Sequence, residues 1–201
     1  MTGRPEDIRG VYERQAAVYD AQRSRALFEA RWLARFAACL PKGGRVLDLG
    51  CGAGEPIARW FIAEGYRVTG MDFAPAMLGI VRSRWPGGDW RQGDMRHLDL
   101  DETFEGIVAW DSFFHLMPED QRATLAKMAA HLVPGGSILV TVGPDATEAT
   151  GSVGGEAVYH ASLSPAGYAV CLEECGLRMT GFLAEDPDTD KHSVLMARKE
   201  E

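Results

Sequence analysis

The chain has 201 residues and a formal net charge of −8, with 46% hydrophobic and 25% charged residues. This length suits one α/β domain, and the composition is that of an ordinary globular protein. The negative charge disfavours binding to nucleic acid or to anionic membrane surfaces. Because no apolar run could span a bilayer and the amino terminus lacks the apolar stretch of a secretory signal, we expect a cytoplasmic protein.

The four cysteines include no C-x-x-C pair, and no group of histidines and cysteines has the spacing of a zinc site. The sequence therefore predicts no metal centre.

Short apolar runs alternate with helical patterns along most of the chain, which is typical of a parallel sheet flanked by helices. The first 44 residues are predicted to be helical, because apolar residues recur at helical spacing up to a Pro-Lys-Gly-Gly stop. Five strands are then predicted, with helices after the first, second and fourth: residues 45–49, 67–71, 89–92, 106–110 and 137–142.

The carboxyl-terminal part breaks this alternation. A helix beginning near Ser164 is followed by two strand-like runs, 178–184 and 193–197, and no helix fits between them. The two runs therefore predict an antiparallel hairpin. The predicted fold is α/β, a doubly wound, seven-stranded, mostly parallel sheet with an antiparallel carboxyl-terminal hairpin and helices on both faces.

Ligand-suited residues follow the predicted strands at the edge where open α/β sheets bind their ligands. Glycines at three alternating positions in residues 50–54 let the backbone turn sharply and approach a ligand closely. Asp72 ends the second strand, where a carboxylate can chelate a ribose diol or cap the next helix. Asp94 follows the third and could accept a hydrogen bond from an adenine amino group. Flat apolar walls beside it would come from Phe73, Met77 and Met95, although Met77 suits the core equally well.

Residues 46–54 (VLDLGCGAG) resemble the first motif of the class I, Rossmann-like S-adenosylmethionine-dependent methyltransferases. Residues 70–78 are similar to the second-strand motif of that family, 93–95 to its adenine-binding segment, and 132–136 to the segment that opens its fifth strand. The resemblance implies S-adenosyl-L-methionine as cofactor, S-adenosyl-L-homocysteine as product, and methyl transfer to a small-molecule acceptor.

The resemblance also assigns roles to individual positions. Gly50, Gly52 and Gly54 would line the methionine moiety, Asp72 would bind the ribose, and Asp94 with Met95 would bind the adenine. The expected neighbours of the amino-acid end are Asp48, which would anchor the loop and face the ammonium through water, and the backbone carbonyl of Trp110. A lid over the cofactor is expected from the amino-terminal segment with Tyr19, while Tyr12 suits either that lid or a helix packed on the sheet edge.

A hydroxyl, amine or thiol acceptor can need a general base. The catalytic candidates are His115, in an apolar run after the fourth strand, and His160, with Asp111 nearby. A histidine in an apolar run can equally serve only to bridge backbone groups. Residues 144–163, which carry His160, are predicted to be a long structureless loop that contributes to the acceptor pocket.

We expect one methyltransferase domain over residues 1–201, acting as a monomer or homodimer on a small molecule, without nucleic acid or membrane. Its parts would be a helical lid (1–44), a cofactor-binding core (45–143), an acceptor-side loop (144–163) and a terminal helix with a hairpin (164–201). An alternative is a non-catalytic S-adenosylmethionine-binding sensor or partner subunit. An NAD(P)-dependent oxidoreductase is disfavoured, because Glu55 would repel a pyrophosphate and the last strand is reversed.

Overall fold

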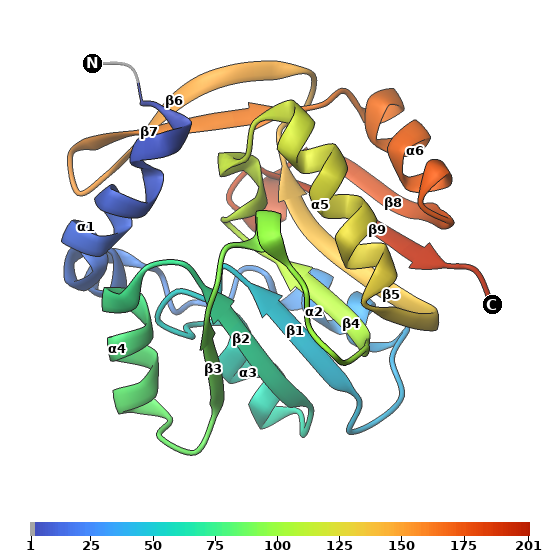
Figure 1. The fold of residues 1–201 in the computed structure, drawn as a ribbon, viewed down its shortest axis with the longest axis horizontal. Helices are drawn as coiled ribbons and strands as arrows, with labels where there is room; N and C mark the ends of the chain where they lie inside the picture. The colour runs from blue at the N-terminus through green and yellow to red at the C-terminus, as the bar shows by residue number, and fades with distance from the viewer. Residues whose placement is uncertain (1–2) are drawn as a thin grey trace.

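A computed structural model describes residues 3–201; residues 1 and 2, the start of the predicted lid, lie outside the described residues. The central sheet contains seven strands: β1 (Arg45–Leu49), β2 (Arg67–Asp72), β3 (Asp89–Gln92), β4 (Phe104–Ala109), β5 (Leu132–Val142), β8 (Leu177–Asp186) and β9 (His192–Lys199). Their order across the sheet is β3-β2-β1-β4-β5-β9-β8 (Figure 1).

The pairing of the strands confirms the predicted fold. β1 to β5 run parallel, whereas β9 pairs antiparallel with both β5 and β8. β9 lies between β5 and β8, so the terminal hairpin forms one end of the sheet. The strand order reverses between β1 and β4, and this switch point opens the space for a ligand at their carboxyl ends.

Helices cover both faces of the sheet, because alternate strand residues point to opposite sides. Val46, Val108 and Leu139 bury one face against α2 (Ala30–Ala37) and α3 (Ile57–Ala63). Leu47, Ile107 and Ile138 bury the other. The helices on that second face are α5 (Pro118–Ala130) and α6 (Pro165–Glu174), while α4 (Pro75–Arg84) packs on β2 and the edge strand β3.

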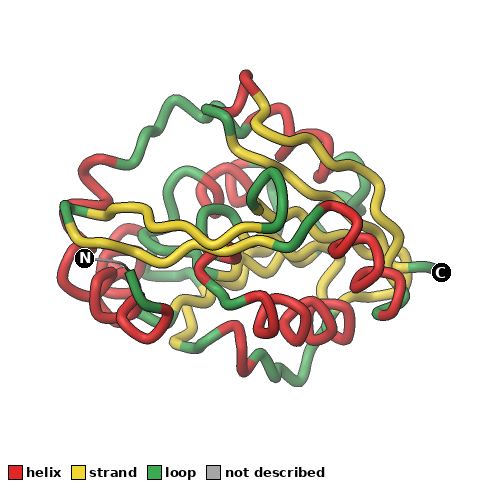
Figure 2. The backbone as a smooth tube through the Cα atoms, turned by 90° about the horizontal axis from the view of Figure 1, so that it is seen from above, coloured by secondary structure: helices red, strands yellow, loops and turns green. Residues whose placement is uncertain are grey.

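Residues 144–163 correct one prediction, because most of them form a hairpin rather than a structureless loop. β6 (Thr147–Val153) pairs antiparallel with β7 (Glu156–Ser162) as a separate two-stranded sheet that lies across the top of the molecule (Figure 2). The turn consists of Gly154 (φ 56°) and Gly155 (φ 82°). Two successive residues with positive φ are what a tight hairpin turn requires, so the Gly-Gly pair was a signal that the sequence reasoning missed.

The first helix, α1 (Ile8–Gln22), lies over the carboxyl edge of the sheet between α4 and the β6–β7 hairpin (Figure 1). On one side the Asp20 carboxylate pairs with Arg84 of α4 at 2.7 Å. On the other side Arg14 and Gln15 donate hydrogen bonds to Glu156 of β7. α1 and the 3-10 turn before it (Pro5–Asp7) lie at this edge, whereas α2, also within the predicted 1–44 lid, packs on a face of the sheet. No helix in residues 3–201 is long and apolar enough to cross a membrane.

Candidate functional site

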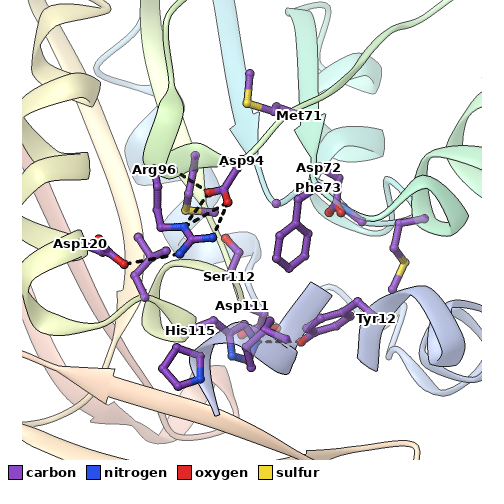
Figure 3. Close-up of a pocket in the computed structure, with 18 of the residues that line it drawn as sticks. Tyr12, Met71, Asp72, Phe73, Asp94, Arg96, Asp111, Ser112, His115 and Asp120 are labelled. Carbon is purple, nitrogen blue, oxygen red and sulfur yellow. Dashed lines mark hydrogen bonds and ion pairs between the residues drawn. The ribbon is translucent and has the colours of Figure 1, made fainter. Parts of the chain in front are cut away.

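A cavity lies between α1 and the carboxyl ends of β1 to β4. Most of the residues selected from the sequence line it, namely Tyr19, Gly50, Gly52, Asp72, Phe73, Met77, Asp94, Met95 and His115 (Figure 3 shows the cavity). They come from α1 and from the segments that follow four different strands, as the switch-point argument predicts.

The glycine loop after β1 shapes one wall of the cavity. Gly50 has a φ of 75°, and a Cβ at this position would lie 2.3 Å from the Cβ of Ser112. Glycine is therefore required both by the backbone conformation and by the close approach of Ser112. Gly52 differs, since a Cβ there would meet only the Met77 sulfur at 3.9 Å. Its missing side chain leaves open space on the cavity side.

The Asp72 carboxylate holds the start of α4, one of the two roles that the sequence left open for it, and also faces the cavity. One oxygen accepts a hydrogen bond from the Gly52 N–H at 2.9 Å, and the other accepts one from the Ala74 N–H at 2.8 Å, at the start of α4. The side chain also lines the cavity. Burial raises the pKa of Asp72 to about 6, although its backbone hydrogen bonds act in the opposite direction.

Asp94 begins the turn after β3 and forms an ion pair with Arg96. Its oxygens lie 3.1 Å from Nε and 2.6 Å from a terminal nitrogen of Arg96, and it also accepts a hydrogen bond from the Arg96 N–H (Figure 3). Arg96 extends to Asp120 at 3.7 Å. Each carboxylate oxygen has two lone pairs, so Asp94 retains capacity for a further donor in the cavity.

Four of the predicted site residues lie outside the cavity lining. Asp48 is 2% exposed within the sheet, and burial, followed by the charge of Asp72, raises its pKa to about 7. A Cβ on Gly54 would collide with Trp85 and Val81, so Gly54 serves helix packing. The Trp110 ring belongs to the buried cluster under α2.

The fourth of these residues is His160, on β7. Its ring packs against Phe114, with a centroid separation of 4.7 Å, and its centroid lies 5.0 Å from that of His115. The hairpin thus places His160 behind His115, away from the cavity.

Glu55 also lies outside the cavity lining, and its carboxylate faces Arg59 at 3.6 Å. The argument that Glu55 would repel a pyrophosphate therefore fails, because the Glu55 side chain does not line the cavity. The acidic character of the cavity comes instead from Asp72, Asp94, Asp111 and Asp120, against one lining cation, Arg96.

His115 joins the lid to the sheet. Its Nδ1 lies 2.8 Å from the Tyr159 carbonyl oxygen, and its Nε2 lies 2.8 Å from the Tyr12 hydroxyl (Figure 3). A carbonyl oxygen only accepts, so Nδ1 carries the proton and Nε2 accepts from Tyr12. Burial lowers the pKa of His115 to about 4, which agrees with this neutral tautomer.

The cavity also contains residues that were not selected as site residues from the sequence. Tyr12 and Asp111, considered only as lid and base candidates, both line it. The others are Pro5, Ile8, Met71, Gly93, Arg96, Ser112, Leu116, Met117 and Asp120. The last three follow the 3-10 turn Phe113–His115 and reach into the first turn of α5, so strand-end position alone does not identify them. In residues 3–201 no group of three or more His, Cys, Asp or Glu side chains could hold a metal ion.

Comparison with known proteins agrees with this geometry. Residues 46–136 match the model of a methyltransferase domain. A 2-phytyl-1,4-naphtoquinone methyltransferase of Thermosynechococcus vestitus is 34% identical over 141 residues, which cover 65% of this chain and 61% of that protein. A dTDP-4-amino-2,3,4,6-tetradeoxy-D-glucose N,N-dimethyltransferase of Saccharopolyspora spinosa is 34% identical over 103 residues, covering 50% and 41%. The chain thus spans about half the length of these curated relatives.

The fold has counterparts among solved structures as well. An S-adenosylmethionine-bound amino pentose methyltransferase from Micromonospora echinaspora superposes with a TM-score of 0.71 at 21% identity. The match covers 92% of this chain and 95% of that one. The resemblance drawn from the sequence is therefore confirmed: residues 46–136 match a methyltransferase domain, and the chain has the fold of the class I, S-adenosylmethionine-dependent methyltransferases.

Proposed function

We propose that the protein catalyses S-adenosylmethionine-dependent methyl transfer to a small-molecule acceptor. The observation that carries the proposal is the cavity itself, in which the glycine loop, Asp72 and Asp94 converge beneath α1. Three independent strand ends contribute to one cavity, and each carries a residue suited to a different part of the cofactor.

The charges that line the cavity fit this cofactor. Four carboxylates and one guanidinium line the cavity, which disfavours a pyrophosphate. Asp94 is paired with that guanidinium, and Asp111 has Arg23 and His192 behind the wall. Among residues 3–201 Asp72 has no cationic partner, and the hydrogen bonds that it accepts there come from backbone N–H groups. A carboxylate in this position can accept further hydrogen bonds from vicinal ribose hydroxyls.

When bound, S-adenosylmethionine supplies a methyl group that its sulfonium has already activated. The protein then has to align the acceptor with that methyl group and exclude water. Tyr12 and Tyr19 of α1 cover the cavity, and the open space at Gly52 allows close approach to the loop. Asp94 and Met95 would hold the adenine, with Phe73 and Met77 as apolar walls. Asp48 and the Trp110 carbonyl would support the amino-acid end from behind the cavity wall.

The acceptor end of the cavity would lie near Tyr12, His115 and Met117. His115 is neutral, but with a pKa of about 4 it is too weak a base to deprotonate an alcohol efficiently at neutral pH. We therefore infer that the acceptor is nucleophilic without prior loss of a proton, as a neutral amine is. Two of the similar proteins are named for amino sugars, which supports this class of acceptor. His160 would act only by packing behind His115.

Isothermal titration of the purified protein with S-adenosylhomocysteine, beside a matched titration with NADH, tests the cofactor. We expect micromolar binding of the first ligand, none of the second, and a loss of at least tenfold in affinity on Asp72→Ala, since hydrogen bonds to a charged group are lost. Binding of NADH alone would overturn the proposal. A screen of small amines and alcohols, with S-adenosylmethionine as donor, then tests the acceptor class.

A cytoplasmic location, the state of monomer or homodimer and the exclusion of nucleic acid as acceptor are proposals as well. The last is supported by the net charge of −8. Gel filtration with light scattering tests the oligomeric state, and an electrophoretic shift assay tests nucleic-acid binding.

A further inference from the structure

A second histidine, His192, lies in a charged cluster behind the cavity wall. It begins β9, and its Nε2 lies 2.8 Å from one oxygen of the Asp111 carboxylate. Asp111 follows β4 and lines the cavity. The other Asp111 oxygen lies 3.3 Å from Arg23, which in turn pairs with the fully buried Glu29. The cluster joins the end of β4, the turn between α1 and α2, and the carboxyl-terminal hairpin.

The contacts of His192 determine its protonation state. Its Nδ1 lies 2.6 Å from the Thr189 carbonyl oxygen, so both ring nitrogens face oxygen atoms. A carbonyl oxygen and an ionised carboxylate only accept hydrogen bonds, so both nitrogens must donate. This hydrogen-bond pattern requires the protonated imidazolium form of His192, whereas the ring of His115 in the same molecule is neutral.

The surroundings of the ring agree with a positive charge. Phe28 stacks on the imidazole at a centroid separation of 5.6 Å, and Trp110 lies at 5.7 Å. Aromatic faces stabilise cations that lie against them. Burial on its own lowers the pKa of His192, but the hydrogen bond and charge of Asp111 outweigh it and leave the pKa raised.

The charges that face His192 from the neighbouring elements balance one another. Asp111 is negative and Arg23 is positive, while Glu29 is paired with Arg23. On the hairpin itself, Asp186 is paired with Arg31 of α2. With His192 protonated, the four groups Asp111, His192, Arg23 and Glu29 carry no net charge. If His192 lost its proton, one of its ring nitrogens would have no hydrogen to donate to the oxygen that it faces.

The backbone of Asp111 has to be held in place by such contacts. Its φ of 53° lies in the left-handed region, which is unfavourable for a residue with a Cβ. The Asp111 N–H donates to the Thr141 hydroxyl at 2.8 Å, which anchors the backbone but not the carboxylate. The orientation of the carboxylate relative to the cavity therefore depends on His192 and Arg23.

We propose that His192, as an imidazolium, is a positioning residue that holds the Asp111 carboxylate at the cavity wall to receive the cationic amino group of the cofactor. The inference rests on the proposed function, because it assigns the cofactor's amino-acid end to this wall. It makes the carboxyl-terminal hairpin, distant in sequence from the glycine loop, a determinant of cofactor affinity. Binding should weaken as His192 loses its proton.

The test compares wild-type protein with His192→Gln by titration with S-adenosylhomocysteine between pH 6 and pH 9. A glutamine side chain can donate one hydrogen bond to Asp111, but it is uncharged and does not titrate. We expect the variant to bind about tenfold more weakly at pH 6, as for loss of a charge-assisted hydrogen bond, and the difference to shrink as the pH rises. Loss of the ligand's own amino proton affects both proteins equally. His97→Gln, which replaces an exposed histidine, is the matched control and should follow the wild type.

Side-chain ¹⁵N NMR of the ligand-free protein provides an independent measurement. We expect two protonated ring nitrogens on His192 and a titration midpoint above the usual value of about 6.5. Asp111→Asn should lower that midpoint. A singly protonated His192 at pH 6 would overturn the inference, as would a wild-type to variant affinity ratio that does not change with pH. Wild-type protein that binds no S-adenosylhomocysteine at any pH would instead overturn the proposed function, and this inference with it.

Discussion

The hydroxyl of Tyr12 lies 2.8 Å from Nε2 of His115, although 103 residues separate them in the sequence. α1 brings the phenol across the carboxyl edge of the sheet, and a short 3-10 turn after β4 brings the imidazole. The hydrogen bond is the direct polar link between the lid and the acceptor end of the cavity. The position of α1 and the orientation of the imidazole are therefore coupled in one contact.

Replacing Tyr12 with phenylalanine keeps the ring and removes this link. We expect kcat for methyl transfer to fall about ten- to a hundredfold, as for loss of a group that handles protons or orients the acceptor. The affinity for S-adenosylhomocysteine should stay within about threefold, since the aromatic wall is retained. Tyr66→Phe is the control, because the Tyr66 hydroxyl bonds the Ala37 carbonyl outside the cavity. Unchanged kcat in Tyr12→Phe would exclude the pair from the reaction.

The low pKa of His115 predicts a loss of stability in mild acid. The folded-state pKa of about 4 lies below the unfolded value of about 6.5, so the unfolded chain takes up the proton first as the pH falls. The stabilisation from keeping the ring neutral is complete above pH 6.5 and is lost between pH 6.5 and pH 4, by about 3 kcal/mol at most.

Urea unfolding of wild type and His115→Gln at pH 7.5, 5.5 and 4.5 measures this contribution. The free energy of unfolding of the wild type should fall more steeply with decreasing pH than that of the variant. His97→Gln, on the surface, should follow the wild type. Parallel curves for wild type and His115→Gln would mean that His115 titrates equally in the folded and unfolded chain.

Gly50 provides a steric prediction with a matched control in the same chain. Gly50 and Gly65 both have positive φ, 75° and 85°, but a Cβ on Gly50 would strike Ser112, whereas nothing lies within 4 Å of one on Gly65. Gly65→Ala should cost only the backbone strain, roughly 1–2 kcal/mol. Gly50→Ala should cost more and abolish binding of S-adenosylhomocysteine in titration. Normal binding by folded Gly50→Ala protein would show that the loop can move away from Ser112.

Much of this architecture could be predicted because each element has a local pattern. The strand of 45–49 is apolar apart from Arg45 and Asp48, and the terminal hairpin follows from the short spacing between two apolar runs. Residues that directly follow predicted strands, such as Asp72 and Asp94, entered the cavity as expected. The end of a strand can be predicted from the sequence, and the parallel sheet brings these strand ends close together in space.

What the sequence could not indicate are the contacts that depend on how separate segments pack. Gly54 belongs to the same motif as Gly50 and Gly52, yet it faces Trp85 of the next unit rather than the cavity. His160 and His115 looked equivalent as bases, and only the β6–β7 hairpin decides that Phe114 and His115 cover His160. His192 carried no local signal at all, because its partners lie on other elements.

Asp48 offers a final prediction, in which stability and ligand binding should change in opposite directions. Its carboxyl is 2% exposed, and burial raises the folded-state pKa to about 7, above the unfolded value of about 3.9. The folded chain therefore retains this proton more strongly. The associated stability is complete below pH 3.9 and is lost as the pH rises through 7, by about 4 kcal/mol at most.

Asp48→Asn removes the charge and keeps the shape. At pH 8.5 the variant should be more stable than the wild type in urea unfolding, and the difference should shrink towards pH 4.5, while the surface variant Asp99→Asn shows neither effect. If Asp48 also faces the cofactor ammonium through water, as the family resemblance implies, the same variant should bind S-adenosylhomocysteine more weakly. Such a buried charge would then be retained for binding at the expense of stability. A variant less stable than the wild type at pH 8.5 would show instead that the carboxylate is stabilised where it lies.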